Sequence, residues 1–198
     1  MRLSRVEKQA QTRGRLLEAA GELFAERGVN GASVEQIAER AGYSRGAFYS
    51  NFEDKAELVV ALLQERTRRE HNEVKGLSWE RVRAWNRSRA RNVTEWLALR
   101  TELWLYSLRD GRVRRQLAER ERFSRNAHQQ GLAEVFRRAG VQPPADIEFL
   151  AVIAHALEDG LLIQRAITPE DVRDEAVVDA VELLCRSWIA LGEKQKRG

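Results

Sequence analysis

Residues 33–55 read SVEQIAERAGYSRGAFYSNFEDK, and this stretch decides the fold of the N-terminal part of the chain. Ser33, followed three residues later by Gln36, has the pattern of a helix-capping box. The apolar positions after it fall on one helical face: Val34, Ile37, Ala38 and Ala41. Gly42 suits the left-handed position that ends a helix, and Ser44 can cap the next one. The stretch therefore predicts two short helices joined by a tight turn, a helix-turn-helix that places its second helix in the DNA major groove.

The second helix of this motif opens with Arg45, Gly46 and Ala47, which combine one long donor with two short residues. A helix entering a groove needs a slim leading end, and arginine can donate two hydrogen bonds to a guanine edge. We therefore expect Arg45 to read a base, and we expect Gly46 and Ala47 to let the backbone come close to the DNA. The alternative is that Arg45 is an ordinary solvated arginine. Asp54 and Glu57 predict the start of a third helix with its own capping box.

A longer pattern extends this motif in both directions. Its positions are Leu16, Leu17, Ala20, Leu23, Phe24, Gly28, Ile37, Ala38, Ala41, Gly42, Ser44, Arg45, Gly46, Phe48, Tyr49, Phe52, Lys55 and Leu58. Over residues 12–64 this pattern resembles the DNA-binding domain of the tetracycline-repressor (TetR) family of transcriptional regulators. The resemblance implies an all-α fold, with an N-terminal helix-turn-helix domain and a C-terminal helical domain for ligand binding and dimerisation.

The resemblance also implies contacts to the DNA backbone. Ser44, Tyr49 and Lys55 are expected to bond phosphates, and Ser33 to assist at the start of the first helix. Such contacts set the register of the protein on DNA, whereas base contacts set sequence preference. The alternative for Tyr49 is a half-buried packing role.

Two neighbouring positions complete the expected interface, and two others belong to the core. Tyr43 can contact either the DNA backbone or a thymine methyl group, and the sequence leaves both open. Asn51 is included as a phosphate contact, although many family members carry His or Tyr there. Phe48 and Phe52 are better assigned to the core, where they would tie the second helix to the first.

Composition supports a helical protein without a membrane segment. The 198 residues are 43% hydrophobic and include only three prolines, and no long segment alternates like a strand. There is no run of 18 apolar residues, and the N-terminus lacks an apolar signal core. The sequence thus predicts a cytoplasmic protein with no membrane partner.

The reactive residue types form no motif for catalysis or metal binding. Cys185 is the only cysteine, so an internal disulfide is excluded, and its apolar neighbours favour a buried inert thiol over a bridge between subunits. The three histidines, His71, His128 and His155, share no metal-ligand spacing, and no nucleotide-binding or zinc-protease motif is present. We therefore expect no cofactor, no metal site and no catalytic residues.

Charge placement is more informative than total charge. The net charge is +4, but residues 1–57 contain nine basic and nine acidic side chains, a difference of zero. Within residues 1–15 the basic side chains dominate: Arg2, Arg5, Lys8, Arg13 and Arg15. This segment is either a flexible basic arm that touches DNA or a disordered solubilising tail.

The chain is expected to form two domains. Residues 1–57 would be the DNA-binding domain with its basic arm, and residues 58–198 the effector-binding and dimerisation domain. Helices are expected near 54–73, 79–94, 95–109, 112–138 and 146–167. Thr168-Pro169 would open a last helix that ends near Leu191, followed by a basic tail.

Two C-terminal helices have wide apolar surfaces. One carries Ile147, Leu150, Ala151, Ala154, Leu157, Leu161 and Leu162, and the other Val177, Val178, Val181, Leu184, Trp188 and Leu191. The family resemblance implies that these helices form a homodimer as a four-helix bundle. The alternative is that both helices only fill the core of one subunit.

An apolar effector pocket is expected within the helical body. Its candidate lining combines aromatic residues with a few polar groups: Trp85, Trp96, Trp104, Phe123, Phe149, Arg100, Asn126 and His128. The alternative for each is plain core packing. The sequence as a whole predicts a repressor that releases a palindromic double-stranded DNA operator when a small molecule binds. A DNA-binding adapter or architectural protein without an effector, and less favourably a helical enzyme, are the rival interpretations.

Overall fold

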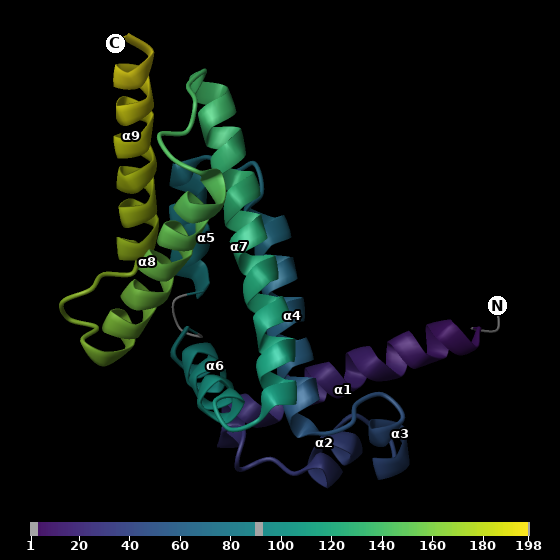
Figure 1. The fold of residues 1–198 in the computed structure, drawn as a ribbon. Coiled ribbons are helices and arrows are strands. Elements are labelled where there is room, and N and C mark those ends of the chain that lie inside the picture. Colours follow the sequence, from purple (N-terminus) through teal and green to yellow (C-terminus); the bar gives the residue numbers. More distant parts are fainter. Residues whose placement is uncertain (1–3, 90–92, 198) are drawn as a thin grey trace. The chain divides into compact units, whose positions relative to one another are not determined.

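The computed structural model describes residues 4–89 and 93–197, and every regular element among them is an α-helix (Figure 1). In chain order the helices are α1 (Arg5–Arg27), α2 (Val34–Arg40), α3 (Arg45–Tyr49), α4 (Lys55–Val74), α5 (Trp79–Arg89), α6 (Val93–Ser107), α7 (Gly111–Ala139), α8 (Ile147–Ile167) and α9 (Ala176–Arg197). The expected all-α fold class is confirmed.

Internal contacts divide the chain into two compact units. Unit 1 consists of Met1–Arg66 and Ala98–Arg120, and unit 2 consists of Thr67–Leu97 and Glu121–Gly198. Helices α4, α6 and α7 each contribute residues to both units. The predicted division into domains 1–57 and 58–198 stays a prediction.

The core of unit 1 is built from the inner faces of its first helices. Residues with almost no exposed surface are Leu16, Leu23, Ile37, Phe48, Phe52, Leu58 and Val59. These come from α1, α2, α3, α4 and the turn before α4, so one hydrophobic core holds the whole helix-turn-helix. The sequence assignment of Phe48 and Phe52 to the core is confirmed, because they are 0% and 1% exposed.

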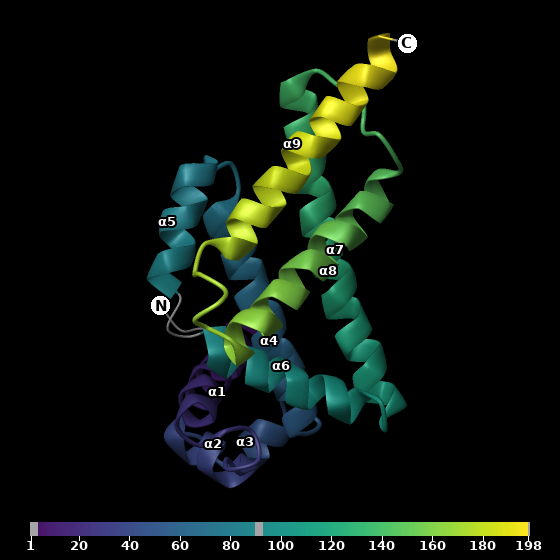
Figure 2. The ribbon, with the colours of Figure 1, turned by 90° about the vertical axis from the view of Figure 1, so that its left-hand side faces the viewer.

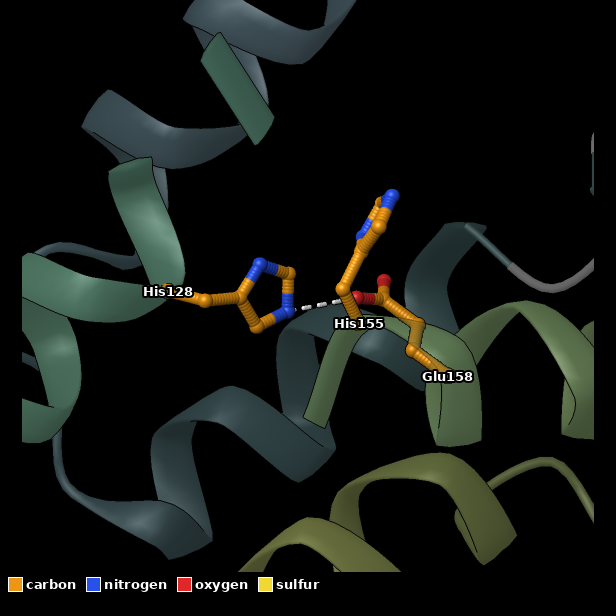
Figure 3. Close-up of side chains that lie close together, drawn as sticks. All are labelled: His128, His155 and Glu158. Carbon is orange, nitrogen blue, oxygen red and sulfur yellow. Dashed lines mark hydrogen bonds and ion pairs between the residues drawn. The ribbon is translucent and has the colours of Figure 1, made fainter. Parts of the chain in front are cut away.

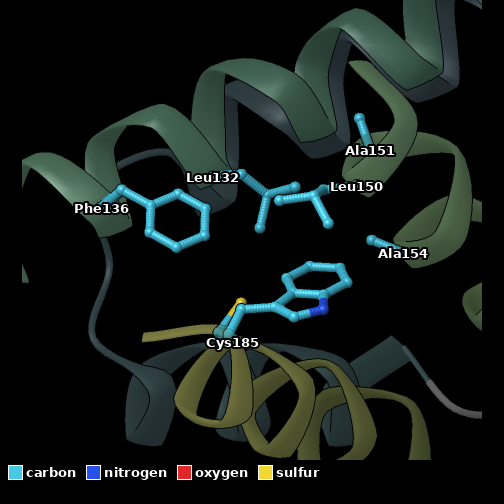
Figure 4. Packing of buried hydrophobic residues seen from close by; sticks show 7 residues of the cluster. Leu132, Phe136, Leu150, Ala151, Ala154 and Cys185 are labelled. Carbon is cyan, nitrogen blue, oxygen red and sulfur yellow. The ribbon is translucent and has the colours of Figure 1, made fainter. Parts of the chain in front are cut away.

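The core of unit 2 forms between α7, α8 and α9. Figure 2 shows α8 and α9 lying side by side. Seven buried residues pack between these three helices: Leu132, Phe136, Leu150, Ala151, Ala154, Cys185 and Trp188 (Figure 4). Cys185 lies within this cluster, 3% exposed, as the sequence predicts. Burial, assisted by the charge of Glu182, raises the pKa of its thiol to about 11.

The N-terminal segment is helical from Arg5 onward. Ser4 and Glu7 form a reciprocal capping box, with Ser4 Oγ accepting from the Glu7 amide and Glu7 Oε2 accepting from the Ser4 amide. Arg13 donates to the Asn51 carbonyl at 2.7 Å and lies over the Phe52 ring. Residues 5–15 therefore form neither a flexible arm nor a disordered tail, and both alternatives are wrong for them; Arg2 lies outside the described residues.

The last helix begins and ends later than the sequence predicts. Thr168 ends α8, its amide donating to the Gln164 carbonyl, and α9 begins only at Ala176. Side chains from earlier helices hold the intervening connection: Asn86 donates to the Asp174 carbonyl at 2.6 Å, and Arg165 pairs with Asp174 at 2.6 Å. These tertiary bonds outweigh the local helix-starting signal of Thr168-Pro169.

The expected basic tail is instead the end of α9, which continues to Arg197. At Gly192 the helix packs closely against the loop that contains Gln142. A Cβ at this position would lie 2.5 Å from the Gln142 carbonyl oxygen, so a larger residue would not fit without a shift. Among the residues that the structure describes, no helix combines the length and apolar character needed to cross a bilayer.

Candidate nucleic-acid interface

The helix-turn-helix forms through the local signals that the sequence contains. Ser33 Oγ accepts from the Gln36 amide at 3.2 Å, and Gln36 Oε1 accepts from the Ser33 amide at 2.9 Å. Gly42 has φ = 77°, the left-handed conformation that ends α2. Ser44 Oγ then accepts from the Ala47 amide at 3.2 Å and starts α3. All three predicted breaks are confirmed.

The start of α4 differs in one bond. Asp54 Oδ1 accepts from the Glu57 amide at 2.9 Å, as a helix cap should. Glu57 Oε2, however, accepts from the Glu53 amide at 2.7 Å rather than from Asp54, so the expected capping box is shifted by one residue. Arg112, at the start of α7, forms ion pairs with both Glu53 and Asp54. These two ion pairs were not predicted, because nothing in the local sequence links Arg112 to residues almost sixty positions earlier.

The outer face of α3 is available for contact while its inner face is buried. Phe48 points inward and its ring packs against Phe52, with 5.6 Å between ring centroids. Arg45, Gly46 and Tyr49 are exposed on the other side. The result is a short helix with a rigid hydrophobic base and a polar outer surface, which is the geometry that groove binding requires.

Arg45 lies at the leading end of this surface. Its guanidinium is 2.9 Å from the Glu35 carboxylate and 3.5 Å from the Tyr49 hydroxyl. The side chain is still 63% exposed, so neither contact buries it. An exposed ion pair of this kind is weak, and a base edge can replace Glu35 at little cost.

The candidate phosphate contacts on the exposed surface keep free hydrogen-bonding capacity. The Ser33 and Ser44 hydroxyl oxygens accept amide bonds at the helix caps. The Ser44 hydroxyl hydrogen can still donate, whereas the Ser33 hydroxyl also bonds the Glu35 carboxylate. Tyr49 is 46% exposed, and Tyr43 is half-buried. Ala47, in the first turn of α3, is also half-buried.

Lys55 and Asn51 have internal partners that the sequence did not predict. Lys55 Nζ donates to the carbonyls of Val29 at 2.8 Å and Ala32 at 3.1 Å. Asn51 Nδ2 donates to the Ala47 carbonyl at 2.8 Å. Both side chains therefore stabilise the loops of the helix-turn-helix. An ammonium group has three donors, so Lys55 keeps one for a phosphate.

The eight pocket candidates are divided between the two units. Arg100 and Trp104 belong to unit 1, and the other six belong to unit 2. Trp104 and Phe149 are 54% and 58% exposed, and Asn126 is also exposed. Trp85 donates from its indole nitrogen to Glu73 at 2.8 Å.

The remaining candidates are half-buried: Trp96, Arg100, Phe123 and His128. Phe123 lies under the guanidinium of Arg68. Their role in ligand binding stays a prediction.

The structure brings together two histidines that the sequence separates by 27 positions (155 − 128). The rings of His128 and His155 lie 5.2 Å apart between centroids, and carboxylates lie beside both. Burial lowers the pKa of His128, but the bond to Glu158 and its charge outweigh burial, so this pKa lies above its usual value. Sequence spacing missed this cluster because the packing of α7 on α8 creates it.

Comparisons with known proteins identify the family to which this helix-turn-helix belongs. Residues 16–62 match the family described as bacterial regulatory proteins, tetR family, and residues 80–190 match the BetI-type transcriptional repressor C-terminal domain. The regulator TtgR of Pseudomonas putida is 32% identical over 182 residues, covering 84% of this chain and 85% of TtgR. The activator FasR of Mycolicibacterium smegmatis is 46% identical over 54 residues, which cover 27% of this chain and only 25% of FasR.

Solved structures support the same fold. A TetR-family regulator from Rhodococcus sp. superposes with a TM-score of 0.69 at 21% identity, covering 91% of this chain and 99% of that one. The shared fold agrees with the family matches to both parts of the chain, which identify the family. The chain belongs to the TetR family of bacterial DNA-binding transcriptional regulators.

Proposed function

We propose that this regulator is a repressor that binds a palindromic operator as a homodimer and releases it when a small molecule binds. The observation that carries the DNA-binding part is the outer face of α3, where Arg45, Gly46 and Tyr49 stand exposed on a buried aromatic base. In this proposal Arg45 reads a base edge. Ser33, Ser44, Tyr49 and the remaining Lys55 donor hold the phosphates.

Exposed apolar side chains on α8 and α9 support the homodimer. Large apolar residues of these helices that are 42–70% exposed in the single chain are Phe149, Val152, Ile163, Ile167, Leu183 and Leu191. Exposed apolar groups gathered on two neighbouring helices favour burial against a partner. A second copy is the partner that fits, because one helix-turn-helix reads only a half-site and a two-fold dimer reads two.

The repressor and effector assignments rest on the C-terminal part. Residues 80–190 match a repressor domain, whereas the similarity to an activator is confined to 54 residues. An effector would act only through its different affinities for the DNA-binding and the released conformations. A DNA-binding adapter without an effector is the rival, and an operator affinity that no ligand changes would favour it.

The first test is selection of bound fragments from sheared genomic DNA with the purified chain at near-physiological salt. We expect a palindromic motif whose half-sites lie about one helical turn, roughly 34–36 Å, apart. Recovery of DNA fragments that share no motif would indicate non-specific binding through charge alone and would contradict the proposal.

The same DNA then tests the recognition residue. Arg45→Ala should weaken operator binding by about 1–3 kcal/mol and relax sequence preference at one base position. Arg27→Ala, which removes an equal charge from the exposed end of α1, is the matched control and should leave sequence preference unchanged. Equal losses for both variants would show that charge, not base recognition, explains the effect.

A further inference from the structure

A cluster of two histidines and three carboxylates lies between α7 and α8, within unit 2. His128 and Glu121 come from α7, and His155, Glu158 and Asp159 come from α8. Figure 3 shows the rings of His128 and His155 gathered with the Glu158 carboxylate. His155, at 9% exposed, is the most buried of the three residues drawn there.

The hydrogen bonds of His128 define which ring nitrogen carries the proton. His128 Nδ1 lies 2.9 Å from the Ser124 carbonyl oxygen, which can only accept, so Nδ1 must be the donor. The other nitrogen, Nε2, lies 2.9 Å from Glu158 Oε2. In a neutral imidazole this places a nitrogen lone pair against a carboxylate oxygen. Such an arrangement needs a cation between the two atoms, either a proton or a metal ion.

His155 also has one ring nitrogen that donates and one that is left bare. His155 Nε2 lies 2.9 Å from Glu121 Oε2 and 3.8 Å from Asp159 Oδ2, so Nε2 donates to a carboxylate. Nδ1 is then the bare nitrogen, and it is buried without a hydrogen-bond partner. A buried polar atom left unsatisfied costs about 1–3 kcal/mol, and a bound cation would remove that cost.

Both rings thus follow the pattern of metal-ligating histidines. Such a histidine donates one ring N–H to a carboxylate or backbone carbonyl, which fixes the tautomer and turns the other nitrogen toward the metal. Here the Ser124 carbonyl orients His128, and Glu121 orients His155. One ligand atom from each of His128, His155 and Glu158 lies within 4.8 Å of the others. In a tetrahedral zinc site such atoms are roughly 3.3 Å apart, so small side-chain shifts close the site.

We propose that His128, His155 and Glu158 bind one divalent transition-metal ion of the Zn²⁺ class. Two imidazoles and one carboxylate favour zinc and its neighbours over Mg²⁺ or Ca²⁺, which prefer all-oxygen ligands. Three protein ligands leave a fourth position for water or an added ligand. Glu121 is a positioning residue that acts through His155. The proposal does not depend on operator binding, so it can fail while the proposed repressor function stands.

The test uses the full, untagged chain after removal of metal by a chelator. Titration with Co²⁺, followed by visible d–d absorption, should show one ion per chain, and Zn²⁺ should displace it. His155→Ala and the isosteric Glu158→Gln should each weaken Zn²⁺ binding, measured by competition with a chromophoric chelator, by at least tenfold. Glu121→Gln should weaken it by about ten- to hundredfold, as expected for an orienting carboxylate.

Glu134 supplies the matched control for Glu158→Gln. Glu134 lies on α7, pairs with Arg137 and Arg138, and belongs to neither group of candidate ligands, so Glu134→Gln should bind Co²⁺ as the wild type does. Circular dichroism of each metal-free variant checks that it folds, and Glu158→Gln changes no side-chain volume. Absence of Co²⁺ absorption at submillimolar protein, where a filled site is visible, or unchanged affinity in His155→Ala and Glu158→Gln, would overturn the proposal. A proton on His128 would then be the cation beside Glu158.

Discussion

Replacing Lys55 with methionine separates its internal role from its predicted role at a phosphate. Lys55→Met keeps the apolar stem but removes the donors to the Val29 and Ala32 carbonyls, at 2.8 and 3.1 Å. In the variant the Val29 carbonyl keeps a partner, because it also accepts from the Ala32 amide. The Ala32 carbonyl loses its Lys55 donor in a residue that is only 1% exposed, so the main cost arises there. One hydrogen bond to a charged donor contributes about 1.5–3 kcal/mol, and we expect the variant to lose that much stability.

For a chain of this length that loss corresponds to a fall in melting temperature of about 3–12 °C. Circular dichroism at 222 nm measures the melting curve, and operator affinity at several salt concentrations measures the number of phosphate contacts. Lys8→Met, on the exposed side of α1, is the control and should melt with the wild type. A Lys55→Met protein that melts within a degree of the wild type, but loses one unit of salt slope, would refute the internal role.

Three further results are expected. Phe48→Ala removes a ring that is 0% exposed and should cost about 3–5 kcal/mol in urea unfolding; a loss below 1 kcal/mol would contradict the core assignment. Leu183→Glu, at a position 67% exposed on α9, should dissociate the proposed dimer in sedimentation, whereas Leu108→Glu, 61% exposed outside α8 and α9, should not. Cys185, with a thiol pKa of about 11, should be about one-thousandth thiolate at pH 8, so native alkylation should be at least a hundredfold slower than in urea.

Local signals made the helix-turn-helix predictable. The caps at Ser33 and Ser44 and the break at Gly42 depend on residues within four positions of each other, and each forms as expected. The start of α9 could not be read in this way. Thr168-Pro169 is a sound local signal, but side chains from α5 and α8 hold the connection that follows it.

The candidate sites show the same division. The motif alone predicts which residues of α3 are exposed, because the position of Phe48 in the core fixes which face of the helix points outward. The pairing of His128 with His155 depends on how α7 packs against α8, and their separation of 27 positions in the sequence does not indicate it. The bonds of Lys55 and Arg13 to distant carbonyls could likewise not be predicted from the sequence.

These bonds of Arg13 and Lys55 bear directly on what holds α3 in place. Helix α3 has only five residues, far fewer than the dozen or so that an isolated helix needs in water. Its position must therefore come from neighbouring elements. Phe48 and Phe52 anchor it in the hydrophobic core. Arg13 of α1 bonds the Asn51 carbonyl that follows α3, and Lys55 of α4 bonds the loop before α2. Since α1 and α4 hold α3, the proposed recognition helix, in place, we expect changes at Arg13 to weaken operator binding through the position of α3. By the same reasoning, a ligand that shifts α4 would alter operator binding by moving the supports of α3 rather than its surface.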